Sequence, residues 1–297
     1  MEKITFCINT ANNEKDYISL LLGSLYNGID INLHDILIFV DSDNQNTTEL
    51  LKSQHDTFPN LKIVKNKSGI PWRYQTNINY MFDIAQTEIV SYLQSDMVVG
   101  LKYDRAILNH LDNNTILSAT RIEPPLHCQH DNQITYVRNF GLTPNSFTYD
   151  LFLQYAESIK NPHKLINYFF APFTLYRNLW ASIGGHDVKF KYSREDSDIL
   201  YRFCLKKYNI IQCFDALVYH FSCTSSRGVR WWENRQIQQT QFDRDAIELE
   251  RFIQKWGSFK HPTSYNQVEN DVINNPNILN NIICHNPPYN ESDLEIL

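Results

Sequence analysis

The 297-residue sequence lacks a run of about 18 apolar residues, an excess of positive charge, and closely paired cysteines. Without such an apolar run, no transmembrane segment is expected. A net charge of -6 and a pI near 5.9 provide no basic field for a long nucleic acid, so nucleic acid is not an expected partner. The six cysteines form no CxxC pair, which favours reduced, buried thiols over a disulfide framework.

The N-terminal sequence also lacks the pattern of a signal peptide, because its apolar stretch is short and soon becomes polar. We therefore expect a soluble protein of the cytoplasm. With 42% hydrophobic and 13% aromatic residues, the chain can bury a full core. It can form one large domain, or one domain with an appendage.

Short β-branched and aromatic runs alternate with stretches of helical apolar spacing through the first 120 or so residues. This alternation is typical of an α/β fold with a mostly parallel sheet. The predicted strands are 3–8, 35–40, 61–65, 89–93 and 116–119, and the predicted helices are 17–26, 47–54, 75–85 and 102–111. Further along we predict strands at 173–176, 210–214 and 216–219, and helices at 195–207 and 231–256.

The segment from about 123 to 172 breaks this alternation with several prolines and many aromatic residues. We interpret it as an insertion beside the binding crevice. The residues after 256 have the composition of a loose tail or a wrapping arm. We therefore divide the chain into a main domain, 1–225, and a C-terminal helix with an extended tail, 226–297.

Three predicted strands are each followed by side chains that carry oxygen atoms. These are Asn9-Thr10, Asp41-Ser42-Asp43 and Gln94-Ser95-Asp96. In open sheets of this kind, ligands bind outside the carboxyl ends of the strands. The three groups therefore predict one polar crevice.

Two acids, Glu195 and Asp196, open the predicted helix 195–207, and His220 directly follows the last predicted strand. Together with Asp96 they provide a carboxylate that can remove a proton, and oxygen and imidazole ligands suited to Mg²⁺ or Mn²⁺. Transfer of a sugar from a nucleotide diphosphate needs both. The sequence therefore indicates an enzyme.

The order of motifs through residues 1–232 resembles that of the GT-A glycosyltransferases, in particular the large inverting family 2. The similar segments are the first strand and its Asn-Glu turn at 6–14, Asp41-Ser42-Asp43, residues 68–77, the DxD position at 94–96, Gly184-Gly185-His186-Asp187 (GGFD), Glu195-Asp196 (ED), His220, and Arg227-Gly228-Val229-Arg230-Trp231 ((Q/R)xxRW). The resemblance implies a Rossmann-like GT-A domain with a C-terminal helical extension. It also implies transfer of a single sugar from a nucleotide-diphosphate donor, expected to be a UDP-sugar, to a hydroxyl of a glycan or other acceptor, with inversion.

The resemblance assigns a role to each candidate site residue. It implies Asp196 with Glu195 as the catalytic base, Asp96 and His220 as ligands of Mn²⁺ or Mg²⁺, and Arg227 and Arg230 as diphosphate contacts. Nucleotide contacts are Thr10, Asn12, Glu14, Asp41, Asp43, Arg73, Asn77 and Ser95. Contacts with the donor or acceptor sugar are Gly185, His186, Asp187 and Trp231.

Two positions depart from the family pattern. Gln94 stands at the first position of the DxD, and Met97 stands where a further acid often occurs. Asp96 is then the one carboxylate of this motif, although His220, phosphate oxygens and water can complete a metal shell. The departures motivate an alternative, a catalytically inactive protein of the same fold that binds a sugar nucleotide or a glycan. A retaining transferase or a nucleotidyltransferase on a related sheet is a third hypothesis.

Several of these residues also suit purely structural roles. Glu195-Asp196 fits a helix N-terminus, Asp41 and Asp43 fit a turn, and His220 fits a core histidine. The stretch His127-Cys128-Gln129-His130 resembles a fragment of a zinc site, but no second pair lies at a standard distance, so zinc is not expected.

Overall fold

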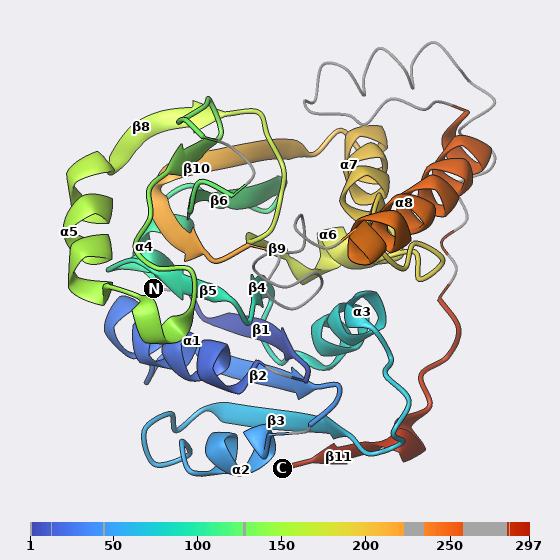
Figure 1. Ribbon diagram of the computed structural model, residues 1–297, viewed down its shortest axis with the longest axis horizontal. Coiled ribbons are helices and arrows are strands. Elements are labelled where there is room, and N and C mark those ends of the chain that lie inside the picture. The colour runs from blue at the N-terminus through green and yellow to red at the C-terminus, as the bar shows by residue number, and fades with distance from the viewer. Residues whose placement is uncertain are drawn as a thin grey trace.

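The computed structural model describes residues 2–12, 14–43, 45–126, 129–222, 235–257, 284 and 286–297 (Figure 1). Within these residues, eleven strands form one mixed sheet with helices on both faces. The strand order is β11-β3-β2-β1-β4-β9-β6-β10-β5, with β7 paired to β6 and β8 paired to β10.

The centre of the sheet is parallel, as predicted. It consists of β3 (Leu61–Asn66), β2 (Asp35–Val40), β1 (Ile4–Thr10) and β4 (Ile89–Gln94), with β6 (Thr115–Glu123) and β10 (Asn209–His220) as a second parallel pair. The antiparallel strand β9 (Phe173–Tyr176) lies between β4 and β6 and joins the two groups. The carboxyl ends of both parallel groups therefore meet at the same edge.

Two apolar layers cover the sheet. One face packs against α1 (Lys15–Gly28), α2 (Thr47–Lys52) and α4 (Tyr103–Leu108). The other face packs against α3 (Tyr74–Ile84), α6 (Arg177–Ser182), α7 (Glu195–Leu205) and α8 (Arg235–Trp256). In α1 the buried residues Ile18, Leu21, Leu22 and Leu25 follow helical spacing, and each stabilises the fold by about 1.5–3 kcal/mol.

One predicted feature of the sheet is wrong. The sequence predicted separate strands at 210–214 and 216–219, but β10 is a single strand with a register shift between Cys213 and Leu217. Pairing with β6 continues on both sides of the shift, and Asp215 within it accepts a hydrogen bond from His110 Nε2 at 3.0 Å. A bulge thus keeps Asp215 within one strand, at the position that the prediction left between two strands.

The 123–172 segment extends the sheet and covers one end of it. After the end of β6 it contains β7 (Thr135–Val137), the 3-10 turn η1 (Pro144–Ser146), α5 (Tyr149–Ile159) and β8 (Asn161–Ile166). Phe152 of α5 packs with Tyr219 and Phe221, next to the short strand β5 (Met97–Val99). Tyr219 and Phe221 of this cluster are the residues on either side of His220 in the chain.

The C-terminal residues wrap around the main sheet. Phe252 and Trp256 of α8 pack against Tyr201 of α7, and Figure 1 shows the two helices side by side. After the 3-10 turn η4 (Glu291–Asp293), strand β11 (Leu294–Ile296) pairs antiparallel with β3 at the outer edge of the sheet. Residues 286–297 thus form the wrapping arm, while the boundary proposed at 225/226 lies outside the described residues.

No helix in the described part of the chain is both long enough and apolar enough to span a bilayer.

Candidate active site

The first three polar groups predicted from the sequence lie at one edge of the sheet. Strands β2, β1 and β4 are neighbours, and Thr10, Asp41 and Ser95 stand at or directly after their carboxyl ends. All three are buried. The predicted convergence of these strand ends is confirmed.

Glu14 ties two of these strand ends together. Its Oε2 accepts hydrogen bonds from the Ala11 amide at 2.9 Å and from Ser95 Oγ at 2.7 Å. Burial raises the pKa of the Glu14 carboxyl, and the Ser95 hydrogen bond opposes that shift. On the other side, the exposed Asn12 donates its amide to Ser42 Oγ at 3.3 Å. These contacts link the residues that follow β1 to those that follow its two neighbours, β4 and β2.

Asp41 shapes the segment that follows β3. Its Oδ1 accepts from Asn66 Nδ2 at 3.0 Å and the Trp72 amide at 2.8 Å, and its Oδ2 accepts from the Arg73 amide at 3.0 Å. Three donors therefore hold this buried carboxylate in place. Arg73 has a positive φ of 72° at this point, where α3 begins.

Asp43 makes contacts typical of a helix-starting acid. Its oxygens accept from the Thr47 amide at 2.7 Å and from the Thr48 amide at 3.0 Å and hydroxyl at 2.7 Å. Burial raises the pKa of Asp43, but the hydrogen bonds from Thr48 and Thr47 outweigh it and lower the pKa overall. Its role toward a nucleotide stays a prediction.

Arg73 and Asn77 face different surroundings. The Arg73 guanidinium lies 4.9 Å from the centre of the Tyr192 ring and donates to its hydroxyl at 3.3 Å. Asn77 is fully buried and donates from Nδ2 to Asn9 Oδ1 at 2.6 Å, while its own Oδ1 has no partner within the described residues. A buried amide oxygen without a donor is costly, so a ligand donor at this point would stabilise it.

Asp96 and His220 face each other across the sheet edge. His220 Nε2 lies 3.6 Å from Asp96 Oδ1, and both residues are buried. Mg²⁺ binds its ligands at about 2.0–2.1 Å, so a single cation can contact both atoms at this separation. The pair is also of the right chemistry, because Mn²⁺ accepts carboxylate and imidazole. Among the described residues no third acid, histidine or cysteine completes a cluster, so phosphate oxygens and water would fill the shell.

Glu195 and Asp196 open α7, as the sequence predicted. Tyr74 lies near Glu195 and acts to lower the pKa of its carboxyl. Burial and the neighbouring Asp196 charge raise the pKa of Glu195 to about 8. Burial also raises the pKa of Asp196, and the positive charge of Arg121 opposes this shift. The two neighbouring carboxyls therefore affect each other's protonation, and the Arg121 charge favours the ionised form of Asp196.

Four of the predicted site acids lie near the side chain of Tyr92. This β4 tyrosine is buried, and its pKa is raised well above the ordinary value by burial and then by the negative charges around it. Those charges belong to Asp196, Asp96, Glu14 and Glu195. Asp96 and both acids at the start of α7 therefore lie near the same tyrosine.

Sequence analysis missed two residues at this site, Arg121 and Glu123. Both lie at the end of β6, which runs four residues past its predicted end at 119. Arg121 Nη1 lies 3.5 Å from Glu123 Oε1, and the guanidinium sits 4.5 Å from the centre of the Phe170 ring. The alternation of charged and apolar residues in Thr120-Arg121-Ile122-Glu123 was the signal available.

Gly185, His186 and Asp187 belong to a packed scaffold. Gly185 has φ of +71°, and a Cβ there would lie 2.5 Å from Asn79 Oδ1. His186 is buried against Trp180 and its pKa is lowered to about 3, first by burial and then by the Arg202 charge. Asp187 Oδ2 pairs with Lys255 Nζ of α8 at 2.7 Å. Sugar contacts by these residues stay a prediction.

Arg227, Arg230 and Trp231 lie outside the described residues, so their assigned roles are also untested.

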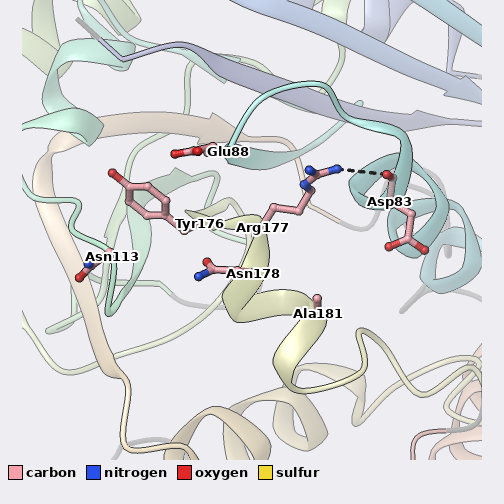
Figure 2. Close-up of a pocket in the computed structure, with 7 residues that line it drawn as sticks. All are labelled: Asp83, Glu88, Asn113, Tyr176, Arg177, Asn178 and Ala181. Carbon is pink, nitrogen blue, oxygen red and sulfur yellow. Dashed lines mark hydrogen bonds between the residues drawn. The ribbon is translucent and has the colours of Figure 1, made fainter.

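A cavity of about 710 Å³ lies away from this site (Figure 2). It is lined by Asp83, Glu88, Asn113, Tyr176, Arg177, Asn178 and Ala181. Tyr176 pairs with Ile89 at the amino end of β4, which places the cavity at the opposite edge of the sheet from Asp96. It has none of the acids described above.

Comparison with known proteins supports the fold. No family model and no curated protein matches the chain. Its fold is similar to GalNAc-T7 with UDP, GalNAc and Mn²⁺, at 12% identity and a TM-score of 0.60, covering 92% of this chain and 57% of that one. A mannosyltransferase from Pyrobaculum calidifontis in complex with GDP-Man and Mn²⁺ has 15% identity and a TM-score of 0.57, with 95% and 73% covered. Residues 1–349 of S. aureus TarS give 14% identity and a TM-score of 0.51, with 86% and 72% covered.

The fold is therefore that of the GT-A glycosyltransferases, as the order of motifs predicted. The chain spans little more than half the length of the GalNAc-T7 chain it matches.

Proposed function

We propose that this protein is an inverting, metal-assisted glycosyltransferase. It moves a single sugar from a nucleotide-diphosphate donor, a UDP-sugar, to a hydroxyl of a glycan or another acceptor. The observation that carries the proposal is the set of acids around Tyr92, to which Glu195, Asp196 and Asp96 all belong, together with the 3.6 Å separation of Asp96 Oδ1 and His220 Nε2. Two of the similar solved structures hold a nucleotide or nucleotide sugar together with Mn²⁺.

Asp196 is the base in this proposal. It takes the proton of the acceptor hydroxyl while that oxygen attacks the anomeric carbon, and the bond from this carbon to the diphosphate breaks on the opposite face. Arg121 favours the ionised form of Asp196, and burial favours the protonated form of Glu195, whose pKa is raised to about 8. One displacement of this kind inverts the anomeric configuration.

The donor would lie along the carboxyl ends of β1, β2 and β4. Two buried polar groups there suit a base and a ribose. They are Asp41, which is hydrogen-bonded to the segment 66–73, and Asn77, whose Oδ1 has no partner within the described residues. Thr10, Asn12, Glu14, Asp43, Arg73 and Ser95 complete this proposed nucleotide set. Asp96 and His220 would hold Mn²⁺ or Mg²⁺, which supplies positive charge for the leaving diphosphate. Arg227 and Arg230 would add to that charge, and Trp231 would stack on a sugar ring.

The test is release of UDP by the Asp196→Asn variant at saturating donor and acceptor. General-base catalysis contributes about 10²–10⁴-fold, so we expect a loss of that size with donor binding retained. Asp215→Asn is a matched control, because Asp215 is a buried carboxylate whose partner is His110, away from the site. A normal rate in Asp196→Asn would remove the catalytic assignment.

Gln94 at the first DxD position keeps one alternative open, a non-catalytic protein that binds a sugar nucleotide. Calorimetry that shows donor binding, combined with no turnover over a panel of acceptors, would support this alternative. Release of pyrophosphate in place of UDP would indicate a nucleotidyltransferase.

A further inference from the structure

We propose that Glu123 is a positioning residue that fixes the ring of His220, with Nε2 directed at Asp96. This inference rests on the proposed function, because it concerns the metal pair of that site, Asp96 and His220. No sequence motif assigned Glu123 a role.

The inference begins with the contacts of the His220 ring. Nδ1 lies 2.7 Å from Glu123 Oε1, and Nε2 faces Asp96 Oδ1 at 3.6 Å. Because a carboxylate oxygen accepts hydrogen bonds, the short contact places the ring proton on Nδ1. In the neutral ring the lone pair is then on Nε2, on the side of Asp96. Ser222 Oγ is also near Nδ1, at 3.4 Å, but that contact is much longer.

Strand register brings Glu123 to this position. β6 and β10 run parallel, with Arg121 opposite Val218 and Ile122 opposite Tyr219, so Glu123 comes level with His220. Side chains two residues apart on a strand share a face, which places Arg121 beside Glu123. The Arg121 Nη1 lies 3.5 Å from the same Oε1 that His220 contacts. Arg121 thus favours a charged carboxylate next to the imidazole.

A second buried histidine in the chain shows what a purely structural pair looks like. His34 Nε2 contacts Asp104 Oδ2 at 3.0 Å, and its Nδ1 accepts the Ile4 amide at 3.1 Å. Both nitrogens of His34 are therefore used within the fold. His220 instead directs its second nitrogen at a carboxylate beyond direct hydrogen-bond distance, across a gap that a cation can fill. A carboxylate behind a metal-binding histidine fixes its tautomer and increases its basicity.

The experiment measures Mn²⁺ binding to the full chain, alone and with UDP, by the electron paramagnetic resonance signal of free Mn²⁺. Loss of an outer partner of this kind costs about 10–100-fold in metal affinity. We expect the Kd to rise about 10-fold in Glu123→Gln, which keeps an acceptor oxygen, and towards 100-fold in Glu123→Ala. Asp215→Asn, which alters the His110 pair, is expected to leave the Kd unchanged.

A second measurement reads the ring directly. ¹⁵N NMR of the metal-free protein is expected to show His220 protonated on Nδ1 in the wild type, and to lose that preference in Glu123→Ala. Circular dichroism checks that each variant is folded.

The outcomes separate the inference from the proposed function. If His220→Ala weakens Mn²⁺ binding but Glu123→Ala binds within twofold of the wild type, Glu123 has no positioning role and the metal pair stands. If the wild type binds no Mn²⁺ with or without UDP, or His220→Ala binds as well as the wild type, the metal part of the proposed function fails and the inference fails with it.

Discussion

Replacing Lys255 by Met tests whether α8 is an integral part of the fold that carries the site. Lys255 Nζ lies 2.7 Å from Asp187 Oδ2 and 2.8 Å from Asp198 Oδ1, and the two carboxylate side chains are 2% and 0% exposed. Removing one partner of a buried pair costs about 3–5 kcal/mol, because a charge is left without compensation. Asp198 keeps Arg202 and Trp256 as partners, and Asp187 keeps the Lys189 amide at 3.1 Å. We therefore expect about 3 kcal/mol, the lower end of that range.

Urea unfolding followed by circular dichroism measures this loss as a shift in the midpoint. Lys52→Met is the matched control, because Lys52 pairs with Glu49 at 3.1 Å on the surface, with side chains 43% and 71% exposed. Such exposed pairs contribute about 0–1 kcal/mol. In the double variant with Asp187→Asn, the loss is expected to be smaller than the sum of the two single losses, since the uncompensated charge is gone. A Lys255→Met midpoint equal to that of Lys52→Met would refute the reasoning.

Three other predictions follow from individual contacts. The pKa of Glu195 is raised to about 8, so the folded state keeps a proton that the unfolded state loses near pH 4.5. This group therefore lowers the stability of the fold as pH rises from 4.5 to 8. Glu195→Gln is expected to flatten that part of the curve of stability against pH, and an unchanged slope would contradict this prediction. Gly185→Ala places a Cβ 2.5 Å from Asn79 Oδ1 at a positive φ. Thermal denaturation should therefore show that the free energy of unfolding falls by at least about 1–3 kcal/mol. The control Gly23→Ala, with nothing within 4 Å of its added Cβ, should show no such loss. Tyr289→Ala removes a ring stacked on Trp72 and a hydrogen bond to Asp83 at 2.7 Å. Proteolysis of the C-terminal arm should therefore become faster than in the wild type. The control Tyr26→Ala, which removes a tyrosine that is 55% exposed, should not have this effect.

The central sheet could be predicted because its strands carry local signals. In β2 (Asp35–Val40), residues 36–40 are apolar on both faces, since helices cover both sides, and the bounds of the strand were predicted correctly. The position of Asp41 at the exit of this strand followed from the same rule. Register and strand direction made the acids converge, and the parallel pairing of β1, β2 and β4 confirms this.

Features that depend on distant segments could not be predicted in the same way. The end of β6 was missed because it depends on pairing with distant strands: Arg121 pairs with Val218 of β10, and Glu123 pairs with Val137 of β7. The role of Lys255 depends on α8 packing beside α7, which no local pattern of the helix reveals. The pairing of β11 with β3 joins residues about 230 positions apart.

A crystal structure with UDP and Mn²⁺ tests the central claim most directly. We expect the cation to contact Asp96 Oδ1 and His220 Nε2, the uracil to lie beside Asp41 and Asn77, and Asp196 to face the diphosphate across an open space for the acceptor. UDP bound at the opposite edge, in the cavity beside Arg177, or Mn²⁺ bound away from Asp96 and His220, would contradict it.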